Sequence, residues 1–594
     1  MIRRGGLSAA FTTGLTEKSL FLFPESDRLS ERERIVLFLP VSREEISRLG
    51  WDRPDVILVS GDAYIDSPFS GVAVIGKYLM KHGFRVAVIS QPSVDDEADI
   101  TALGEPRLFW GISAGCVDSM VANYTASGKP RRQCDFTPGG ENNRRPDRAS
   151  IVYTGLIRRY FKQTKPIVLG GVEASLRRIA HYDFKTDKVR RPLLFDAKAD
   201  YLVYGMGEYT VCRLAQRLAA GEDGRSLDGL CFLSREKPAD ALELPSFEEA
   251  AADKDAFHRM FRLFSDNSEA PSGRQLAQKC GDRWLVQNKP LFWTQQMLDE
   301  ACDLSFERTV TPKIKGTVRA VDTIRFSMMS HRGCFGGCSF CAIAVHQGRR
   351  VVSRSLSSVE KEVGAIMALP DFKGIITDIG GPTANMYGMT CPKAETRGAC
   401  TRKRCLYPHP CPSLHISHEP LLKLLEAVRQ KPGVRKVFAA SGVRPDLVTA
   451  DSRFGETYIR ALAQHHVSGQ LKLAPESGSA AVLDQMKKPR SDSFLRFCAL
   501  YRRACRKANK NQFISCYFMA AHPGETQKEA GETRRFIRRE LAFHPEQVQI
   551  FTPTPSTWAT CAYYTGLDEE GQPVSVEKRL SQKERFKSLI TGKR

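Results

Sequence analysis

The sequence lacks any long hydrophobic run. No continuous apolar stretch reaches the roughly 18 residues that a membrane-spanning helix needs, so we expect no membrane partner. The N-terminal segment MIRRGGLSAAFTTGLTEK contains basic residues but no continuous apolar segment, unlike a secretory signal. These absences predict a cytoplasmic protein.

Acidic charge is also scarce relative to basic charge. The chain has 67 Asp and Glu against 88 Lys and Arg, which gives a net charge of +21. Much of the excess falls late in the chain, in runs at 487–490, 502–507, 534–539 and 578–594. Solvated helix faces and a disordered tail explain any single run better than a binding site does. Together the runs make RNA, or another anionic molecule, a candidate substrate class.

Cysteine, in contrast, is plentiful. The chain has 17 cysteines and no secretory signal, which favours metal or redox chemistry over disulfides. Seven of them are crowded between Cys334 and Cys411. The middle of the chain is therefore where we expect the chemistry.

The first half of the chain has an α/β pattern. Short apolar runs at 56–60, 85–90, 109–114, 167–169 and 201–205 alternate with helical patterns. Such runs are typical of a parallel sheet covered on both faces. The pattern predicts a Rossmann-like domain over 49–235, after an irregular N-terminal extension at 1–48 and before a helical connector at 236–318.

A second α/β series follows. Its strand candidates lie at 324–329, 374–379, 437–440, 471–474, 513–519 and 548–551, with helical patterns between most of them. Six units predict a partial (βα)6 barrel, with the chemistry at the C-terminal ends of the strands. We expect this core to span 319–570, to carry a Cys-rich insertion at 386–418 and to be followed by a basic tail at 571–594.

Three cysteines directly follow the first strand of this series. Cys334, Cys338 and Cys341 have the spacing C-x3-C-x2-C, which would also place them on one face of a helix. The nearby Gly333, Gly336 and Gly337 argue against a helix, because each glycine inside one costs roughly 1 kcal/mol relative to alanine. Glycines suit a loop that wraps closely around an inorganic cluster. Three thiolates on a [4Fe–4S] cluster leave one iron open for a small molecule.

This loop resembles the signature of the radical S-adenosylmethionine superfamily. The resemblance implies a [4Fe–4S] cluster and S-adenosylmethionine as cofactors, and reductive cleavage of the latter to a 5′-deoxyadenosyl radical. It also implies an electron donor such as flavodoxin or ferredoxin. No individual residue is assigned as the catalytic group that acts on the substrate.

The same resemblance implies which residues meet the nucleotide. Phe340 matches the aromatic residue near the adenine, and the Gly380–Gly381 edge matches the segment that holds the methionine amino group by its backbone. The usual acidic residue of that segment is replaced by Pro382. Polar contacts to the ribose, the carboxylate or the substrate are implied for Ser441, Arg444 and Glu476.

The insertion carries a second cysteine group. Cys391, Cys400, Cys405 and Cys411 lie in an irregular segment rich in proline and charge, where core burial is a poor reason for four cysteines. A structural zinc ion and a second iron–sulfur cluster both require four such ligands. The sequence predicts a metal site here and leaves the choice between zinc and iron–sulfur open.

The N-terminal domain is similar to the cobalamin-binding-type domains of other members of the superfamily. Its first loop, 62–69, offers no histidine to bind cobalt, and Ser67 stands where one would be sought. This argues against cobalamin, although base-off binding without a histidine stays open. Blocks at 123–126, 137–140, 145–149, 170–178 and 204–208 resemble the YgiQ-like radical S-adenosylmethionine proteins over nearly the whole chain. That resemblance implies no particular substrate.

Two other functions compete with a radical enzyme of unknown substrate. One is a non-catalytic, metal-stabilised nucleic-acid-binding protein that uses the basic runs and the four-cysteine insertion. The strand pattern and the three-cysteine first loop argue against it. The other is a cobalamin-dependent radical methyltransferase, which the missing loop histidine weakens.

Overall fold

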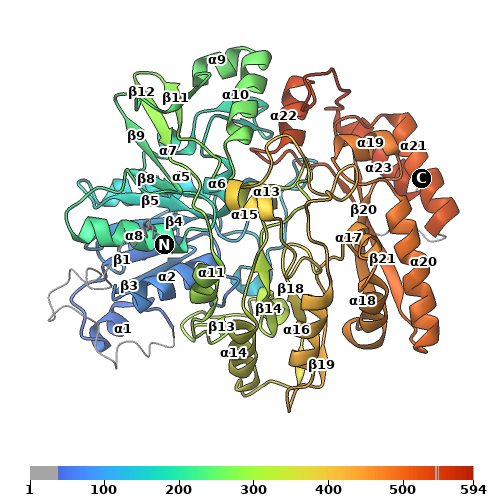
Figure 1. Ribbon diagram of the computed structural model, residues 1–594. Coiled ribbons are helices and arrows are strands. Elements are labelled where there is room, and N and C mark those ends of the chain that lie inside the picture. Colours follow the sequence, from blue (N-terminus) through green and yellow to red (C-terminus); the bar gives the residue numbers. More distant parts are fainter. Residues whose placement is uncertain (1–37, 542–544, 546, 593–594) are drawn as a thin grey trace, which may run out of the picture.

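The computed structural model describes residues 38–541, 545 and 547–592. Figure 1 shows an α/β protein in which an N-terminal sheet, in blue to green, lies beside a set of barrel strands in yellow to red. The predicted extension at 1–48 falls mostly outside the described residues. Its last part contains helix α1 (Arg43–Arg48), whose N-cap Ser42 accepts a hydrogen bond from the Glu45 amide, so the prediction of an irregular segment is wrong there.

The N-terminal half is built on one nine-stranded sheet, with the order β10-β11-β12-β9-β8-β5-β4-β1-β3. Strands β3, β1, β4, β5 and β8 are parallel, and β1 pairs with both β3 and β4. This confirms the Rossmann-like prediction. The nine strands are β1 (Val56–Ser60), β3 (Val86–Ser90), β4 (Phe109–Ser113), β5 (Ile167–Gly170), β8 (Tyr201–Val203), β9 (Leu230–Ser234), β10 (Leu242–Leu244), β11 (Leu276–Cys280) and β12 (Arg283–Gln287).

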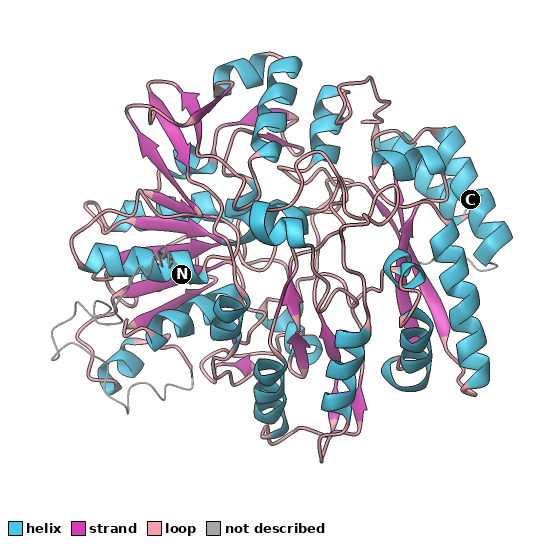
Figure 2. Cartoon of the chain, viewed as in Figure 1, coloured by secondary structure: helices cyan, strands magenta, loops and turns pink. Residues whose placement is uncertain are grey.

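Helices cover both faces of this sheet (Figure 2). All five residues of β1 are buried, as a continuous apolar strand between two helical layers should be. The helices of this half are α2 (Gly71–Lys81), α3 (Ala98–Thr101), α4 (Ser119–Asn123), α5 (Ala149–Tyr160), α6 (Gly171–Leu176), α7 (Leu193–Ala197), α8 (Glu208–Ala219), α9 (Phe247–Ala252), α10 (Lys254–Asp266) and α11 (Gln295–Cys302).

The predicted helical connector at 236–318 needs a correction. Helices α9, α10 and α11 lie in it, but so do strands β10, β11 and β12, which extend the nine-stranded sheet. Two fully buried glutamines interrupt the apolar pattern of these strands. Gln278 accepts a hydrogen bond from the Ala180 amide at 2.9 Å, and Gln287 accepts one from Arg178 at 3.1 Å. These two polar residues interrupt the apolar pattern by which buried strands are recognised. The hydrophobicity of the sequence therefore did not reveal β11 and β12.

The second half is a partial barrel, as predicted. Its strands pair in parallel as β14–β18, β17–β19 and β20–β21–β22, and a parallel bridge joins Val443 to Leu473. They are β14 (Ser327–Met329), β17 (Ile375–Ile376), β18 (Asp378–Gly380), β19 (Lys436–Val437), β20 (Gln470–Glu476), β21 (Phe513–Ala520) and β22 (Gln547–Ile550).

Helices surround these strands. They are α12 (Ala320–Ile324), α13 (Ala342–Gln347), α14 (Leu356–Met367), α15 (Pro392–Arg397), α16 (Glu419–Arg429), α17 (Pro445–Ala450), α18 (Gly455–Ala461), α19 (Ala480–Gln485), α20 (Asp492–Lys507), α21 (Gln527–Phe536), α22 (Trp558–Thr565) and α23 (Leu580–Thr591). Within the described part of the chain, no helix combines the length and the apolarity that crossing a membrane requires.

The basic C-terminal segment also departs from expectation. It forms α23, which packs against α21 and β22, rather than a disordered tail. Phe586 and Ile590 are buried in the barrel core. The apolar residues of this segment recur at helical spacing, and Lys583 is buried on the same face, where it donates to the Tyr563 hydroxyl at 2.7 Å.

Candidate functional site at the ends of the barrel strands

The three-cysteine loop lies between β14 and helix α13. Residues 333–341 are irregular, and α13 begins only after Cys341, its N-cap residue. Cys334, Cys338 and Cys341 all line one cavity of about 200 Å³ at the C-terminal ends of the barrel strands. The cysteines are therefore not a buried stripe on a helix.

Steric constraints explain why glycines occupy these positions of the loop. Gly333 and Gly337 have φ angles of +81° and +57°, a region that other residues rarely adopt. A Cβ atom on Gly336 would lie 2.8 Å from Nη1 of Arg444 and 3.3 Å from Sγ of Cys334. Gly336 thus keeps the space between the sulfurs and the guanidinium open.

Burial and one nearby cation set the electrostatics of the loop. Burial raises the pKa of the Cys341 thiol to about 12, and it also raises the pKa of Cys334. Nη1 of Arg444 lies 3.7 Å from Sγ of Cys338, so a positive charge stands beside this sulfur. Three soft ligands around one cavity, next to a cation and a glycine that leaves room, match the donor set of an iron–sulfur cluster.

Three further predicted residues line the same cavity, namely Phe340, Arg444 and Glu476. Arg444 donates two hydrogen bonds to the Asp446 carboxylate, at 3.0 and 2.8 Å, which fixes its orientation. Phe340 packs edge-on against His522, with ring centroids 6.0 Å apart. An aromatic face and a positioned cation therefore border the three sulfurs.

Glu476 ends strand β20 in an unusual conformation. Its φ angle is +66°, which is uncommon outside glycine and concentrates at functional sites. Burial raises the pKa of its carboxyl group, while Lys488, at 3.5 Å, opposes that effect. The side chain is a hydrogen-bond acceptor held at the cavity wall by a backbone that the fold constrains.

The other three predicted residues lie behind this wall. Gly380 ends β18 and Gly381 follows it, and the residues that line the cavity there are Pro382 and Thr383. Ser441 donates to the Asp378 carboxylate, whose Oδ1 also accepts the Ala440 amide at 2.7 Å. A Cβ atom on Gly380 would lie 2.5 Å from the Ser441 hydroxyl.

Asp378 is a residue whose own role the sequence did not reveal. Burial raises the pKa of its carboxyl group, and its hydrogen bonds join β18 to the segment that carries Ser441. The only sequence signal was an acidic residue just before the Gly380–Gly381 pair. Asp378 organises the cavity from behind and does not line it.

The second cysteine group lies beside the first. Cys391, Cys405 and Cys411 belong to a small apolar cluster that also contains Phe335 and Cys334, whereas Cys400 is exposed. Over residues 38–541, 545 and 547–592, no three Cys, His, Asp or Glu side chains are placed to hold a single metal ion, and this holds for both cysteine groups. The metal site at the insertion therefore stays a prediction.

The arginines of the N-terminal blocks make ion pairs inside their own domain. Arg145 pairs with Asp62, Arg177 pairs with Asp118 at 2.7 Å, and Arg148 pairs with Asp183 at 3.0 Å. All three carboxylates are nearly inaccessible. These arginines stabilise the domain rather than presenting free charge to an anion.

Two family models together match most of the chain. The model described as "Radical SAM N-terminal" matches residues 38–327, and the one described as "Radical SAM superfamily" matches residues 328–537. The junction falls at β14, the first barrel strand. The second match contains all the predicted cysteine ligands.

Similar proteins were found among curated relatives and solved structures. A UPF0313 protein of Fusobacterium nucleatum is 48% identical over 562 residues, 94% of this chain and 99% of the relative. A UPF0313 protein of Thermotoga neapolitana is 46% identical over 565 residues, again 94% and 99%. Among solved structures, one similar chain is the radical S-adenosylmethionine methyltransferase TsrM from Kitasatospora setae, with cobalamin and a [4Fe–4S] cluster bound. It is 16% identical, and the match covers 86% of this chain and 78% of TsrM with a TM-score of 0.47.

Proposed function

Because the chain belongs to the radical S-adenosylmethionine superfamily and, within it, to the UPF0313 (YgiQ-like) family, we propose that it cleaves S-adenosylmethionine reductively at the cavity described above. It is an enzyme whose substrate is unknown. One observation carries the proposal: Cys334, Cys338 and Cys341 share a cavity with Phe340, Arg444 and Glu476 at the C-terminal ends of the barrel strands.

The three cysteines would hold a [4Fe–4S] cluster. When bound, this cluster supplies the electron that splits the sulfur–C5′ bond of S-adenosylmethionine into methionine and a 5′-deoxyadenosyl radical. A reductant such as flavodoxin or ferredoxin would deliver that electron to the protein. Gly336 keeps the sulfur-lined space open, and Arg444 places positive charge beside the Cys338 sulfur.

The remaining cavity residues would orient the nucleotide. Phe340 offers an apolar edge to the adenine, with His522 behind it. Burial lowers the pKa of His522 to about 4, so its imidazole is neutral near pH 7 and adds no charge behind the adenine. Glu476, held by Lys488, offers a hydrogen-bond acceptor for ribose hydroxyls. The Gly380–Gly381 edge would contact the nucleotide through its backbone. Ser441 would position the cavity wall through its hydrogen bond to Asp378.

The test is an anaerobic reconstitution with iron and sulfide, followed by dithionite and S-adenosylmethionine. We expect 5′-deoxyadenosine from the unaltered chain and at least a hundredfold less from Cys338→Ala. Cys498→Ala is the matched control, because Cys498 is buried in α20, away from the cavity. Equal amounts of 5′-deoxyadenosine from all three proteins, or none from the unaltered reconstituted chain, would refute the proposal.

We also propose that Cys391, Cys400, Cys405 and Cys411 bind a zinc ion or a second cluster. Three of them share a small apolar cluster beside Cys334, and Arg349 donates to the Cys400 carbonyl at 2.8 Å, which links the insertion to the cluster loop. Iron and zinc are counted per chain in the unaltered protein, Cys405→Ala and Cys498→Ala. Loss of one zinc, or of one cluster's worth of iron, only in Cys405→Ala supports the site. An unchanged metal content refutes it.

RNA stays a proposed substrate class, supported only by the net charge of +21. Many basic side chains of the late runs are already paired, such as Lys487 with Glu570 and Arg490 with Asp484. The cobalamin-dependent alternative gains no support from the loop at 62–69, where Ser67 is fully buried and no histidine is present.

A further inference from the structure

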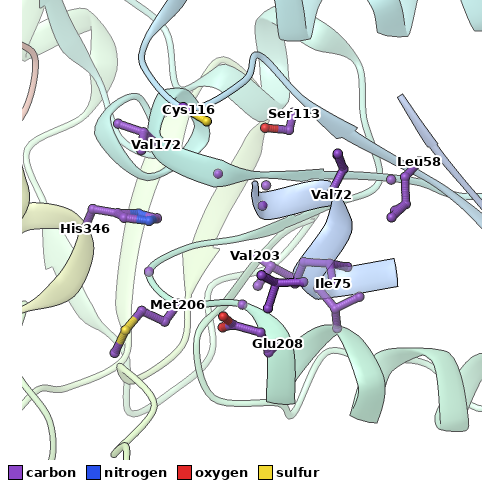
Figure 3. Close-up of a pocket in the computed structure, with 18 of the residues that line it drawn as sticks. Leu58, Val72, Ile75, Ser113, Cys116, Val172, Val203, Met206, Glu208 and His346 are labelled. Carbon is purple, nitrogen blue, oxygen red and sulfur yellow. The ribbon is translucent and has the colours of Figure 1, made fainter. Parts of the chain in front are cut away.

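A second cavity lies where the nine-stranded sheet meets the barrel. It has a volume of about 300 Å³ and lies at the C-terminal ends of β1, β4, β5 and β8, facing helix α13 of the barrel half (Figure 3). Its walls are mostly aliphatic, with Leu58, Val72, Ile75, Val203 and Met206 among them. C-terminal strand ends of open parallel sheets are common ligand sites, and this volume is at the lower end for small-molecule sites.

Glu208 lines this cavity and has one carboxylate oxygen without a partner in the described structure (Figure 3). The residue begins α8 and is 6% exposed. Its Oε1 lies 2.7 Å from Nη1 of Arg332, whereas its Oε2 is buried and has no hydrogen-bond partner in the described structure. A buried carboxylate oxygen without a donor costs free energy of folding. A bound molecule with a hydrogen-bond donor would remove that cost.

His346 presents a second acceptor from the opposite wall. Its Nδ1 lies 2.9 Å from the Ser175 hydroxyl, which donates its single proton to the Gly171 carbonyl at 2.9 Å and accepts the Gly205 amide at 3.0 Å. With the hydroxyl proton on the Gly171 carbonyl, Nδ1 carries the imidazole proton and Nε2 is an acceptor. Burial lowers the pKa of His346 to about 4, so the ring is neutral near pH 7.

These features define the chemistry of a molecule that would fit this cavity. The walls are mostly apolar, Oε2 of Glu208 is a buried acceptor without a partner in the described structure, and the His346 ring bonds there through Nδ1. The carboxylate of Glu208 is already balanced by Arg332, so a charged ligand would bury an uncompensated charge. The occupant should therefore be neutral, mainly apolar and equipped with hydrogen-bond donors.

We propose that this cavity is a binding site for a small neutral molecule, mainly apolar, that carries a hydroxyl or N–H donor recognised by Glu208 and His346. The site is distinct from the sulfur-lined cavity, with which it shares no lining residue. The proposal stands on the cavity's own geometry and does not depend on radical chemistry.

Three probes with equal numbers of heavy atoms test the proposed class, namely 2-phenylethanol, propylbenzene and 2-phenylethylammonium. Their dissociation constants are measured by ligand-observed NMR titration on the full chain. We expect 2-phenylethanol to bind at least fivefold more tightly than the hydrocarbon, which lacks a donor, and than the ammonium ion. Equal or reversed affinities would overturn the proposal.

Variants then localise the binding. Val172 lines the cavity and is half-buried, so Val172→Trp should fill it and abolish saturable binding of 2-phenylethanol. Val94→Trp is the matched control, because Val94 is 37% exposed on a loop. His346→Leu and, independently, Glu208→Gln should each reduce the preference for the alcohol over the hydrocarbon to less than twofold. Unchanged binding by Val172→Trp, or an unchanged preference in both acceptor variants, refutes the site.

Hydroxocobalamin provides the competing outcome. Its saturable binding, if lost in Val172→Trp but kept in Val94→Trp, would overturn the small-ligand class in favour of a much larger cofactor. Circular dichroism and S-adenosylmethionine binding confirm that each variant is folded. A failure at this cavity is thus distinguishable from a failure at the sulfur-lined one.

Discussion

Gly336 is the glycine of the cysteine loop that lies between the sulfurs and the Arg444 guanidinium. A Cβ atom there would lie 2.8 Å from the Arg444 guanidinium and within 3.6 Å of the Cys334 and Cys338 sulfurs. We expect Gly336→Ala to lower the iron content after reconstitution by at least half. Gly364→Ala is the control, because that helical glycine has no neighbour within 4 Å and alanine is favoured in helices. Equal iron in both variants would show that the space at Gly336 is not needed.

Glu525 gives the chain a pH-dependent instability. Burial raises the pKa of its carboxyl group from 4.5 to about 8, and its Oε1 has no partner in the described structure. Between those pH values the folded state binds more protons at this site than the unfolded state does. The free energy of unfolding should therefore fall as the pH rises from about 4.5 to 8, by a few kcal/mol at this one site.

Glu525→Gln removes this titration and should be increasingly stabilising, relative to the unaltered chain, as the pH rises across the same window. Urea unfolding midpoints at pH 5, 6.5 and 8 measure the difference. Glu222→Gln is the control, because Glu222 is exposed. A constant difference for Glu525→Gln at all three pH values would contradict the assignment.

At the scale of elements, the C-terminal helix α23 contributes to the barrel core. Ile590 is fully buried against the core that includes α21. Truncating a buried isoleucine typically costs 2–5 kcal/mol, so we expect Ile590→Ala to destabilise the fold by about 2 kcal/mol, since a terminal helix can partly relax. Arg585→Ala, at an exposed position of the same helix, should change stability by less than about 0.5 kcal/mol. Equal unfolding midpoints would mean that α23 is not docked.

The sequence predicted those elements that follow one simple pattern. Strands such as β1 and β21 were found because their apolar runs are continuous or alternate regularly. Strands β11 and β12 were missed because buried Gln278 and Gln287 serve partners distant in sequence. Helix α23 was missed because the terminal segment was interpreted from its basic residues, although Phe586 and Ile590 recur at helical spacing.

The site likewise contains residues that the sequence pattern predicts and residues that only the fold brings together. The cysteines and glycines were predictable, since their spacing and type follow from local chemistry. The link from Asp378 to Ser441 and the acceptor pair of Glu208 and His346 were not, because each joins segments far apart in the chain. Only the three-dimensional fold brings such residues together.

At the scale of the whole molecule, a buried ion pair ties the two halves together. The Glu269 carboxylate accepts the Arg349 amide at 3.1 Å and its side chain at 3.2 Å, and Arg349 also donates to the Cys400 carbonyl. Glu269→Ala would leave the nearly buried Arg349 without its partner. Removing one member of such a pair typically costs 3–5 kcal/mol.

We therefore expect Glu269→Ala to lower the unfolding midpoint strongly and to reduce iron loading at the nearby cysteine loop. Glu243→Ala is the control, because its pair with Lys237 is solvent-exposed. Urea unfolding followed by tryptophan fluorescence measures the first effect, and iron analysis the second. Equal behaviour of the two variants would contradict a coupling role for Glu269.

Helix α13 follows directly after its N-cap Cys341 and ends at Gln347, so one short helix borders the sulfur-lined cavity at its start and the aliphatic cavity at its end. If occupancy of one cavity shifts α13, the two binding equilibria are thermodynamically linked. If a ligand in one cavity changes the dissociation constant at the other by some factor, a ligand in the other cavity changes the first dissociation constant by the same factor. A molecule bound at the sheet edge would therefore act as an effector of nucleotide binding, and measuring either affinity with the other site filled reports the same coupling.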